Sequence, residues 1–450
     1  MIRMMLSQAA QALGGSLDGA DAAFTGVSTD SRQWLSGALF IALGGESFDG
    51  HDFLAQARAR GAVGALVSRR VDDPLPQVRV AEPLAGLQTL AALWRQRFRG
   101  QVVGLTGSNG KTTVKAMTAA ILRQAGSTLA TQGNFNNHIG VPLTLLELAD
   151  ETFAVVEMGA NHPGEIALLA GLARPDLAII TQAGRAHLAG FGSLEGVATA
   201  KGEIIDAVPE EGTVVLNADD PFLPLWQARA GSRRVVTFGL DESATIRAVA
   251  MDLRWDDAGF ASHFQIPWQG NVLDIRLALA GIHNVRNALA AAAAALTLGV
   301  APTAVATGLA GLSPGPGRLH VQRRADGAWV VDDSYNANPD SLAAAIAVLA
   351  AAPGTPWLVL GDLGELGPDG LALHRSLGER ARAAGLARLY ATGSLAAGSV
   401  ATFGPGGRHF ATPEALIETL RVEVNGDVAV LIKGSRSARM ERVVQALMVI

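Results

Sequence analysis

The segment from Val102 to Thr113 constrains the fold of this chain more than any other. It reads Val-Val-Gly-Leu-Thr-Gly-Ser-Asn-Gly-Lys-Thr-Thr, so an apolar strand runs into a glycine-rich turn and Lys-Thr-Thr opens a helix. Backbone N–H groups in such a turn converge on an anion, and the positive end of the helix dipole adds to the attraction. The sequence therefore predicts an α/β fold with a phosphate-binding loop at the carboxyl end of a strand.

The side chains of this phosphate loop (residues 106–113) suit a nucleoside triphosphate. Lys111 is expected to reach the β- and γ-phosphates, and the Thr112 hydroxyl to be a ligand of Mg²⁺. The spacing is shorter than in the common Gly-x-x-x-x-Gly-Lys-Ser/Thr motif, because Gly107 stands three residues before Gly110 and the first glycine of that motif stands five before the second. The alternative is an ordinary strand–helix turn with a surface lysine, and we expect Lys115 to be a solvated helix residue. The predicted nucleotide-binding residues here are Gly107, Ser108, Asn109, Gly110, Lys111, Thr112 and Thr113.

Apolar strands and helical patterns alternate on both sides of this loop. In the middle of the chain the predicted strands are 102–106, 153–157, 177–181, 213–217 and 235–238. Such continuous apolar runs between helices predict a parallel sheet that is covered on both faces. Residues 245–279 predict a small antiparallel excursion with a turn at 255–259, and a helix is expected at 284–298.

The flanking parts of the chain have their own patterns. Short strands are predicted at 24–27, 38–42, 64–67 and 78–81, and a helix at 84–98 leads into the central part. Ser313-Pro-Gly-Pro-Gly is a helix-incompatible linker. A second βα series follows, with strands at 329–333, 357–361, 388–391 and 427–433. The predicted fold class is α/β in three domains: a small mixed α/β domain (1–84), a central parallel-sheet domain with the phosphate loop (85–313) and a Rossmann-like C-terminal domain (314–450).

Composition excludes several classes of protein. With 36 Lys and Arg against 41 Asp and Glu, the net charge of −5 gives no electrostatic basis for nucleic-acid binding or a polybasic membrane patch. The absence of cysteine excludes disulfides and thiolate chemistry. The first residues do not form a secretory signal, and no apolar run reaches the roughly 18 residues of a membrane span. We therefore expect a soluble, cytoplasmic protein, and a monomer, because no coiled-coil pattern calls for a partner chain.

Two polar residues follow neighbouring predicted strands. Glu157 ends the run Val155-Val156-Glu157, and His187 comes shortly after the strand that ends at Thr181. Both are expected at the carboxyl edge of the sheet that carries the phosphate loop, where open α/β sheets bind ligands. A carboxylate and an imidazole there suit Mg²⁺ held against a triphosphate, although Mg²⁺ prefers oxygen. The alternative for His187 is a hydrogen-bonded loop histidine.

Lysine is rare in this chain. Of the 36 basic residues only Lys111, Lys115, Lys201 and Lys433 are lysine, so the remaining lysines are enriched for positions where arginine cannot substitute. Lys201 lies in a helical pattern, and a neutral amine there could react with CO₂ to give a carbamate, an oxygen ligand for a second Mg²⁺. The alternative is a helix lysine in a salt bridge.

Further polar clusters follow toward the C-terminus. Asn284 and Asn287 lie three residues apart on one helical face, and their amides can read an adenine edge; the alternative is a helix cap. Arg318 meets the γ-phosphate only if the C-terminal domain closes on the central one. The acidic strand end at Asp332–Asp333 and the following Asn336 and Asn338 suit ribose hydroxyls or a peptide ammonium. The alternative for this segment is a loop that caps the next helix.

Taken together, these motifs resemble the Mur ligase family along the full length of the chain. Residues 28–32 and 44–51 are similar to the family's UDP-binding domain, which implies substrate contacts from Ser31, Arg32, Gly45, Asp49 and His51. Residues 133–144 resemble the loop that contacts the muropeptide, which implies roles for Asn134, Asn136 and Asn137. Residues 186–193 and 200–203 resemble the second-metal segment, in which the family's lysine, here Lys201, is carbamylated. Residues 332–338 and 361–367 are similar to the family's dipeptide-adding version.

This resemblance implies ATP-dependent amide formation through an acyl phosphate. It implies ATP, two Mg²⁺ ions and carbamylated Lys201 as cofactors, with Thr112, Glu157, His187 and Lys201 as metal ligands. Lys111, Glu157, His187 and Lys201 are the implied catalytic residues, and Arg318 and Asp333 join the nucleotide site. The implied substrates are UDP-N-acetylmuramoyl-tripeptide and D-alanyl-D-alanine.

Three alternatives remain at this point. Another Mur ligase would differ only in the incoming amine. A folylpolyglutamate synthetase shares the loop and the chemistry, but the UDP-type N-terminal domain is evidence against it. A phosphate-loop switch or motor would hydrolyse ATP without an acyl acceptor and would not need Lys201 or the third domain.

Overall fold

A parallel sheet organises the middle of the chain. In the computed structural model, which describes residues 1–45, 48–256 and 259–449, its seven strands have the order β14-β13-β12-β11-β8-β10-β9. They are β8 (Gln101–Thr106), β9 (Thr128–Ala130), β10 (Phe153–Glu157), β11 (Leu177–Ile180), β12 (Thr213–Asn217), β13 (Arg234–Gly239) and β14 (Ile246–Arg247). The five predicted strands are confirmed. The prediction missed β9 and β14, because these short edge strands lack a continuous apolar run.

Helices cover both faces of this sheet, as the apolar strands predict. Val102 and Val156 point into one core, and their neighbours Val103 and Val155 point into the other. The first core contains α3 (Pro83–Arg95), α5 (Gly140–Leu146), α6 (Glu165–Ala173), α8 (Leu194–Gly202) and α9 (Leu223–Ala230). The second contains α4 (Lys111–Leu122), α10 (Ile282–Thr297) and α11 (Pro302–Ala310). The carboxyl edge of the sheet, with the phosphate loop at the end of β8, stays open between these layers.

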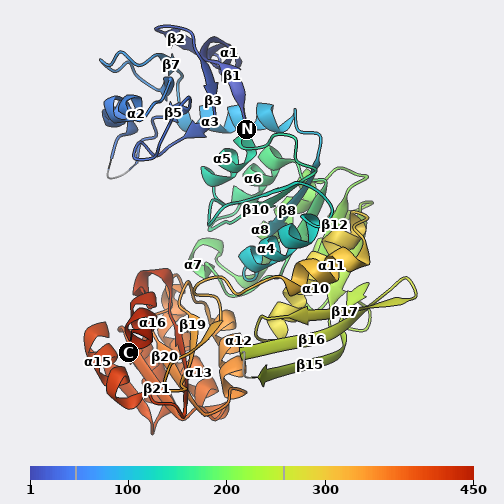
Figure 1. The fold of residues 1–450 in the computed structure, drawn as a ribbon, viewed down its shortest axis with the longest axis vertical. Coiled ribbons are helices and arrows are strands. Elements are labelled where there is room, and N and C mark those ends of the chain that lie inside the picture. Colours follow the sequence, from blue (N-terminus) through green and yellow to red (C-terminus); the bar gives the residue numbers. More distant parts are fainter. Residues whose placement is uncertain (46–47, 257–258, 450) are drawn as a thin grey trace.

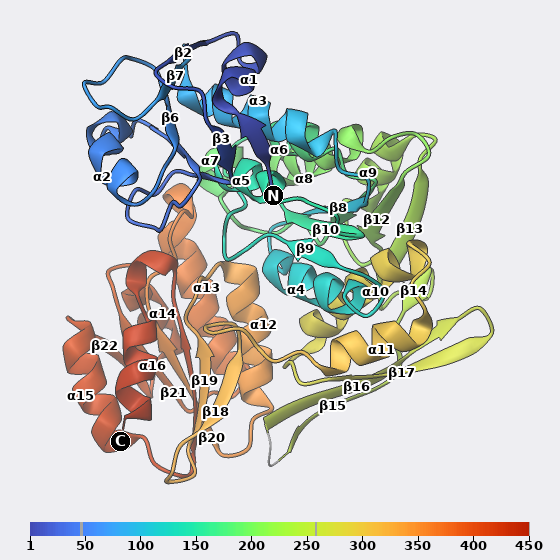
Figure 2. The ribbon, with the colours of Figure 1, turned by 45° about the horizontal axis from the view of Figure 1, so that its top comes forward.

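The predicted antiparallel excursion is present. It consists of β15 (Val249–Asp256), β16 (Gly259–Trp268) and β17 (Asn271–Leu277), which pair in that order. The residues expected at the centre of its turn, 257–258, lie outside the described part of the chain. Figure 2 shows β15 and β16 running beneath α11, with one end beside the C-terminal domain.

The C-terminal domain is a second covered sheet. Its described strands have the order β18-β19-β23-β20-β21-β22, with only β18 antiparallel to its neighbour. They are β18 (His320–Arg323), β19 (Trp329–Asp333), β20 (Thr355–Leu360), β21 (Arg388–Thr392), β22 (Gly407–Phe410) and β23 (Val428–Lys433). One face packs on α12 (Pro339–Ala350), α13 (Gly370–Ala383) and α14 (Ala396–Phe403), and the other on α15 (Pro413–Glu423) and α16 (Glu441–Met448). The four predicted strands are confirmed, and the two edge strands were missed.

The N-terminal domain has a mixed sheet with the order β2-β7-β6-β5-β4. Its strands are β2 (Ser16–Asp18), β4 (Val27–Ser28), β5 (Leu39–Ile41), β6 (Gly64–Val67) and β7 (Gln77–Arg79), and its helices are α1 (Leu6–Ala12) and α2 (Leu54–Ala59). The single strand predicted at 24–27 is wrong. Gly26 has φ +84° and divides it into β4 and β3 (Ala23–Thr25), and β3 pairs instead with β1 (Arg3–Met5). In Figure 1 the central domain lies between the two others.

The helix α3 connects the N-terminal and central domains. Glu82 caps it by accepting hydrogen bonds from the backbone N–H groups of Leu84 and Ala85, and Pro83 occupies the first turn. The boundaries predicted after residues 84 and 313 stay predictions, and the first of them falls within this helix. No helix in the described ranges is long and apolar enough to cross a membrane.

The tip of the β15–β16 hairpin joins the central domain to the C-terminal domain through aromatic rings. The Trp255 ring lies 5.6 Å from that of Phe260 in its own hairpin and 5.6 Å from that of Trp329 on β19, both edge to face. Val321 of β18 packs on the same apolar core. These contacts lie outside the open edge of the central sheet, so they hold the two domains together independently of the site described below.

We expect Trp255→Ala to weaken this contact between domains. Truncating a half-buried aromatic ring costs about 2 kcal/mol, less than the roughly 3–5 kcal/mol of a fully buried one. The first thermal unfolding transition should therefore fall by about 4–8 °C, the shift expected for a domain of 150–250 residues. Differential scanning calorimetry measures this shift. Trp34→Ala is the matched control, because Trp34 is 76% exposed; an equal shift in both variants would contradict a role for the hairpin contact.

Candidate active site

A cleft of about 1130 Å³ lies between the open edge of the central sheet and the C-terminal domain. Most of the predicted site residues line it: Ser108, Asn109, Gly110, Lys111, Thr112, Thr113, Asn134, Asn136, Asn137, Glu157, His187, Asn284, Asn287, Arg318, Asp333, Asn336 and Asn338. Gly107 and Lys201 are not part of its lining, and neither are the predicted residues of the N-terminal domain. The cleft therefore brings together side chains from two domains, and some of these side chains are more than 200 positions apart in the sequence.

The phosphate loop needs glycine at two positions. Gly107 has φ +148°, and a Cβ there would lie 1.9 Å from Thr181 Oγ1. Gly110 has φ +82°, and a Cβ there would lie 2.4 Å from Asn287 Oδ1 on α10. Any side chain at either position would therefore displace a neighbouring group as well as strain the backbone.

Lys111 folds back over this loop. Its Nζ donates hydrogen bonds to the carbonyl oxygens of Gly107 (2.7 Å) and Ser108 (3.3 Å). Burial lowers the pKa of Lys111, the charge of Glu157 opposes this shift, and Arg318 adds to it. The ammonium group therefore stands at the mouth of the loop, where a bound phosphate would replace the carbonyl oxygens as its partner.

Glu157 connects three parts of the central domain. It ends β10 and is buried, with its Oε1 accepting hydrogen bonds from Thr112 Oγ1 (3.2 Å) and Asn136 Nδ2 (2.8 Å). Its other oxygen, Oε2, accepts no hydrogen bond from the described residues and pairs instead with the ammonium group of Lys115, 3.4 Å away. The predicted neighbourhood of Glu157 and the phosphate loop is therefore present.

The expectation that Lys115 is solvated is wrong. Lys115 is only 6% exposed, and its Nζ lies 3.4 Å from Glu157 Oε2 and donates to the Gly133 carbonyl at 3.1 Å. It follows Lys111 by one helical turn, so both point from α4 toward the same sheet edge. Lys201 was considered a functional residue because lysine is rare in this chain, and the same argument applies to Lys115.

Arg318 crosses from the C-terminal domain to the phosphate loop. Its Nη2 donates a hydrogen bond to Thr112 Oγ1 at 3.1 Å, and its guanidinium lies 4.2 Å from the centre of the Tyr335 ring. The C-terminal domain is therefore closed on the central domain, which is the condition under which Arg318 was expected to reach the γ-phosphate. A second contact joins Asn109 of the loop and Asn338, whose Nδ2 donates to Asn109 Oδ1 at 2.6 Å.

His187 also lines the cleft. His187 has φ +55° and precedes the short helix α7 (Leu188–Phe191), and its Nδ1 contacts the carboxylate of Glu365 from the C-terminal domain. Burial lowers the pKa of His187. Glu365 opposes this shift, and the charges of Lys111 and Lys201 add to it. Sequence reasoning missed Glu365, because no local pattern shows a contact between segments so far apart.

Lys201 is buried beneath this point. Its side chain on α8 is 1% exposed, and its Nζ donates to the Ala160 carbonyl at 3.3 Å and lies 5.1 Å from the centre of the Phe191 ring. No carboxylate of the described residues forms an ion pair with it, so the alternative of a helix salt bridge is wrong. Burial lowers the pKa of Lys201 to about 7, and the charge of Lys111 contributes.

The amides of α10 lie behind the phosphate loop. Asn287 Nδ2 donates to Asn284 Oδ1 at 3.0 Å, and Asn284 Nδ2 donates to the Ala280 carbonyl at 2.8 Å. The two side chains thus share one helical face, as predicted. Their proposed role in reading adenine stays a prediction.

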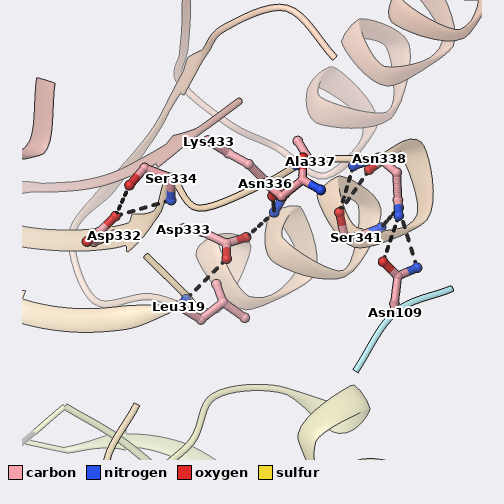
Figure 3. A network of polar contacts seen from close by, with 10 residues as sticks. All are labelled: Asn109, Leu319, Asp332, Asp333, Ser334, Asn336, Ala337, Asn338, Ser341 and Lys433. Carbon is pink, nitrogen blue, oxygen red and sulfur yellow. Dashed lines mark hydrogen bonds and ion pairs between the residues drawn. The ribbon is translucent and has the colours of Figure 1, made fainter. Parts of the chain in front are cut away.

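The acidic strand end of the C-terminal domain forms a buried network (Figure 3). Lys433 Nζ lies 2.5 Å from Asp333 Oδ2 and donates to the Asn336 carbonyl at 3.0 Å. Asn338 also caps α12 by accepting a hydrogen bond from the Ser341 N–H. The capping alternative therefore holds for Asn338, which at the same time contacts the phosphate loop. Lys433 was not predicted as a site residue, although it is one of only four lysines in the chain.

The predicted UDP-binding residues form a separate cluster in the N-terminal domain. Asp49 Oδ1 accepts hydrogen bonds from the His51 N–H and Nδ1, and Arg69 Nη2 donates to Asp49 Oδ2. Contacts from His51 and Arg69 hold the pKa of Asp49 well below its usual range. Ser31 Oγ donates to Gln56 Oε1, and Arg32 pairs with Asp30. Gly45 is described, whereas Glu46 and Ser47 of the same motif lie outside the described residues.

Three α/β units and one interdomain cleft with a glycine-rich loop are typical of one class of protein, and the chain belongs to it: the Mur ligase family. The model of the Mur ligase middle domain matches residues 105–295, that of the Mur ligase glutamate ligase domain matches 317–436, and that of the Mur ligase family catalytic domain matches 23–85.

Particular relatives are similar over the whole chain. The UDP-N-acetylmuramoyl-tripeptide–D-alanyl-D-alanine ligase of Escherichia coli (strain K12) is 47% identical and covers 99% of both chains. A crystal structure of MurF from Acinetobacter baumannii superposes with a TM-score of 0.93 at 35% identity, covering 100% of both chains. The crystal structure of MurF ligase from Thermotoga maritima in complex with ADP has a TM-score of 0.82 at 29% identity, covering 94% of this chain and 97% of that one.

Proposed function

We propose that this chain is the ATP-dependent ligase that adds D-alanyl-D-alanine to UDP-N-acetylmuramoyl-tripeptide, giving the pentapeptide precursor of peptidoglycan. The relatives that carry this activity in their names match 94–99% of the chain. The single observation that carries the proposal is the hydrogen bond from Arg318 to Thr112, because it places the C-terminal domain over the phosphate loop. A switch or motor would have no need of a third domain there.

The reaction proceeds in two steps. A carboxylate oxygen of the tripeptide attacks the γ-phosphorus of ATP, the bond to the bridging oxygen breaks, and ADP leaves. The amine of D-alanyl-D-alanine then attacks the carbonyl carbon of the acyl phosphate, loses a proton and displaces inorganic phosphate. Because two anions must approach each other in the first step, positive groups at the phosphate loop stabilise its transition state.

The residues of this chain supply those groups. Lys111 lies at the loop and Arg318 approaches it from the opposite domain, so both face the position of the transferred phosphoryl group. The contacts of Asn109 with Asn338 and of His187 with Glu365 also join the two domains. Closure of this kind excludes water, which would otherwise hydrolyse the acyl phosphate.

The residues present fit a Mg²⁺ ion at the first predicted metal site. Glu157 Oε2 is a buried carboxylate oxygen that accepts no hydrogen bond from the described residues, with the Lys115 ammonium 3.4 Å away as its ion-pair partner, and Oε1 of the same carboxylate lies 3.2 Å from the Thr112 hydroxyl. Both are oxygen ligands of the kind that Mg²⁺ prefers. When bound, the ion supplies positive charge that offsets the charge of the triphosphate.

We propose His187 and carbamylated Lys201 for the second site. The buried amine of Lys201 has a lowered pKa and no carboxylate in an ion pair with it among the described residues, which are the conditions for reaction with CO₂. Carbamylation would turn a buried cation into a pair of oxygen ligands beside the His187 segment. The UDP-binding role of the Asp49–His51 cluster, the cytoplasmic location and the monomeric state are likewise predictions from the sequence.

The experiment that tests the function is an ADP-release assay with a panel of amines. UDP-muramoyl tripeptides with meso-diaminopimelate or lysine at the third position are each combined with single amino acids and with dipeptides. We expect stoichiometric ADP and peptide bond formation only with D-alanyl-D-alanine. A preference for a single amino acid would indicate another Mur ligase, and phosphate release without an acyl acceptor would indicate a switch.

A further inference from the structure

His374 is a buried histidine that the reaction described above does not use. It lies on α13, is 0% exposed and touches the loop that follows β20. This loop, residues 361–367, forms part of the C-terminal wall of the cleft through Gly364, Glu365 and Leu366. The question is therefore what fixes the shape of this wall.

The hydrogen bonds of His374 define its protonation. Its Nδ1 lies 2.7 Å from the Gly370 carbonyl oxygen, which can only accept, so Nδ1 carries the proton. Its Nε2 lies 3.1 Å from the backbone N–H of Leu363, which can only donate, so Nε2 is the acceptor. The geometry allows only the neutral Nδ1–H tautomer. Burial lowers the pKa of His374 and favours the same form, although the hydrogen bond to the Gly370 carbonyl and the charge of Asp362 oppose the shift.

The start of the loop is held by hydrogen bonds to Asp362. The Asp362 carbonyl accepts hydrogen bonds from Ser435 Oγ (2.6 Å) and from the Ser435 N–H (3.0 Å), and the Asp362 carboxylate accepts from the N–H groups of Leu395 and Ala396. Between Asp362 and Glu365, the loop backbone is held by the hydrogen bond that the Leu363 N–H donates to the His374 side chain. Glu365 itself has φ +60°, a conformation that a non-glycine residue holds only when its surroundings impose it.

We propose that His374 is a positioning residue for the amine substrate: its Nε2 holds the Leu363 backbone so that the 361–367 loop presents the C-terminal wall of the cleft. This inference rests on the proposed function, in which ATP occupies the phosphate loop and the tripeptide enters from the N-terminal side. The dipeptide is then the substrate that meets the C-terminal wall. Glu365 of this loop lines the cleft there, with its carboxylate in contact with His187 Nδ1.

The test compares two replacements of His374. Glutamine can place its Oε1 near the position of Nε2 and keep an acceptor for the Leu363 N–H, whereas leucine fills a similar volume and has none. We expect His374→Leu to raise the KM for D-alanyl-D-alanine about 10- to 100-fold, the effect of leaving one buried donor unpaired. The KM for ATP should stay within about twofold, and His374→Gln should restore the dipeptide KM to within about threefold.

Ser399→Ala is the matched control. Ser399 Oγ donates to the backbone carbonyl of His374 at 2.6 Å, so its removal disturbs the same helix packing but leaves the Nε2 acceptor intact. An equal rise in the dipeptide KM in this variant would overturn the proposal, because the effect would then come from packing. So would a rise in the KM for ATP equal to that for the dipeptide, or failure of glutamine to restore the KM.

A second measurement does not depend on activity. Nitrogen NMR of the full chain labelled at histidine, with the signal of His374 assigned by its loss in His374→Gln, reports the tautomer directly. We expect the Nδ1–H form at neutral pH, and the Nε2–H form or the imidazolium would overturn the proposal. If the wild-type chain does not use the dipeptide at all, the proposed function fails, while this measurement still decides the role of His374 in the loop.

Discussion

Replacing Lys111 by alanine is expected to lower kcat by about 10²–10³-fold, the scale of removing one preorganised electrostatic group from an active site. The Nζ of Lys111 lies at the mouth of the phosphate loop, and Thr112 and Glu157 border the same point. An alanine there leaves the loop backbone in place but removes the positive charge beside the expected position of the transferred phosphoryl group. The loss should therefore appear in turnover more than in the binding of the tripeptide.

Folding is not expected to explain this loss. Burial already lowers the pKa of Lys111, so removing the side chain relieves a buried charge, and the Tm should not fall. Steady-state ADP release measures kcat, and calorimetry checks the Tm. Arg123→Ala is the matched control, because Arg123 is an exposed residue at the opposite end of the same helix. Near-normal turnover in Lys111→Ala would refute the phosphate role of this lysine.

The fold was largely predictable because its strands carry local signals. The buried strands β8, β10 and β12 are continuous apolar runs, and each ends near a polar residue at the same sheet edge. The edge strand β9 is half-buried, β22 has two exposed residues in four, and neither carries such a run, so they were missed. The break at Gly26 was missed for a related reason: a two-residue strand depends on its partners in space, which the local sequence does not show.

Those parts of the site were predictable in which the type of a residue and its place in a local motif indicate its chemistry. Thr112, Glu157 and Arg318 were expected in one place, and the structure brings them together. Contacts between residues that lie far apart in the sequence, such as Glu365 with His187, have no local signature. The burial of Lys115 was missed because its helical pattern alone suits solvent; the scarcity of lysine was the better guide, since all four lysines are engaged inside the fold.

Replacing Lys201 by alanine is expected to lower kcat by about 10²–10³-fold, and added short carboxylic acids should restore part of the activity. The side chain is enclosed among Ala160, Phe191 and the sheet edge, so its removal leaves a space in which formate or acetate can stand where the carbamate would be. Lys201→Arg is the matched control. Its longer side chain fills the space and forms no carbamate, so the acids should not rescue it.

The lowered pKa of Lys201 makes the carbamate accessible at neutral pH. With a pKa of about 7 roughly half of the amine is neutral there, whereas the ordinary value of 10.5 would leave only about one molecule in a thousand neutral or fewer. Carbon NMR with labelled bicarbonate should show a carbamate signal in the wild-type chain that is absent from Lys201→Ala. No such signal, together with no rescue by acids, would count against carbamylation.

The same shift predicts how stability depends on pH when CO₂ is excluded. Between about pH 7 and 10.5 the unfolded chain holds a proton on Lys201 that the folded chain has lost, so the free energy of unfolding rises with pH across this window. Below pH 7 the buried cation costs the folded state about 4–5 kcal/mol. Lys201→Met should therefore be more stable than the wild type at neutral pH, and denaturant titration should show this advantage shrinking toward pH 10. An advantage that stays constant with pH would mean that Lys201 is protonated in the folded chain, and a protonated amine does not react with CO₂.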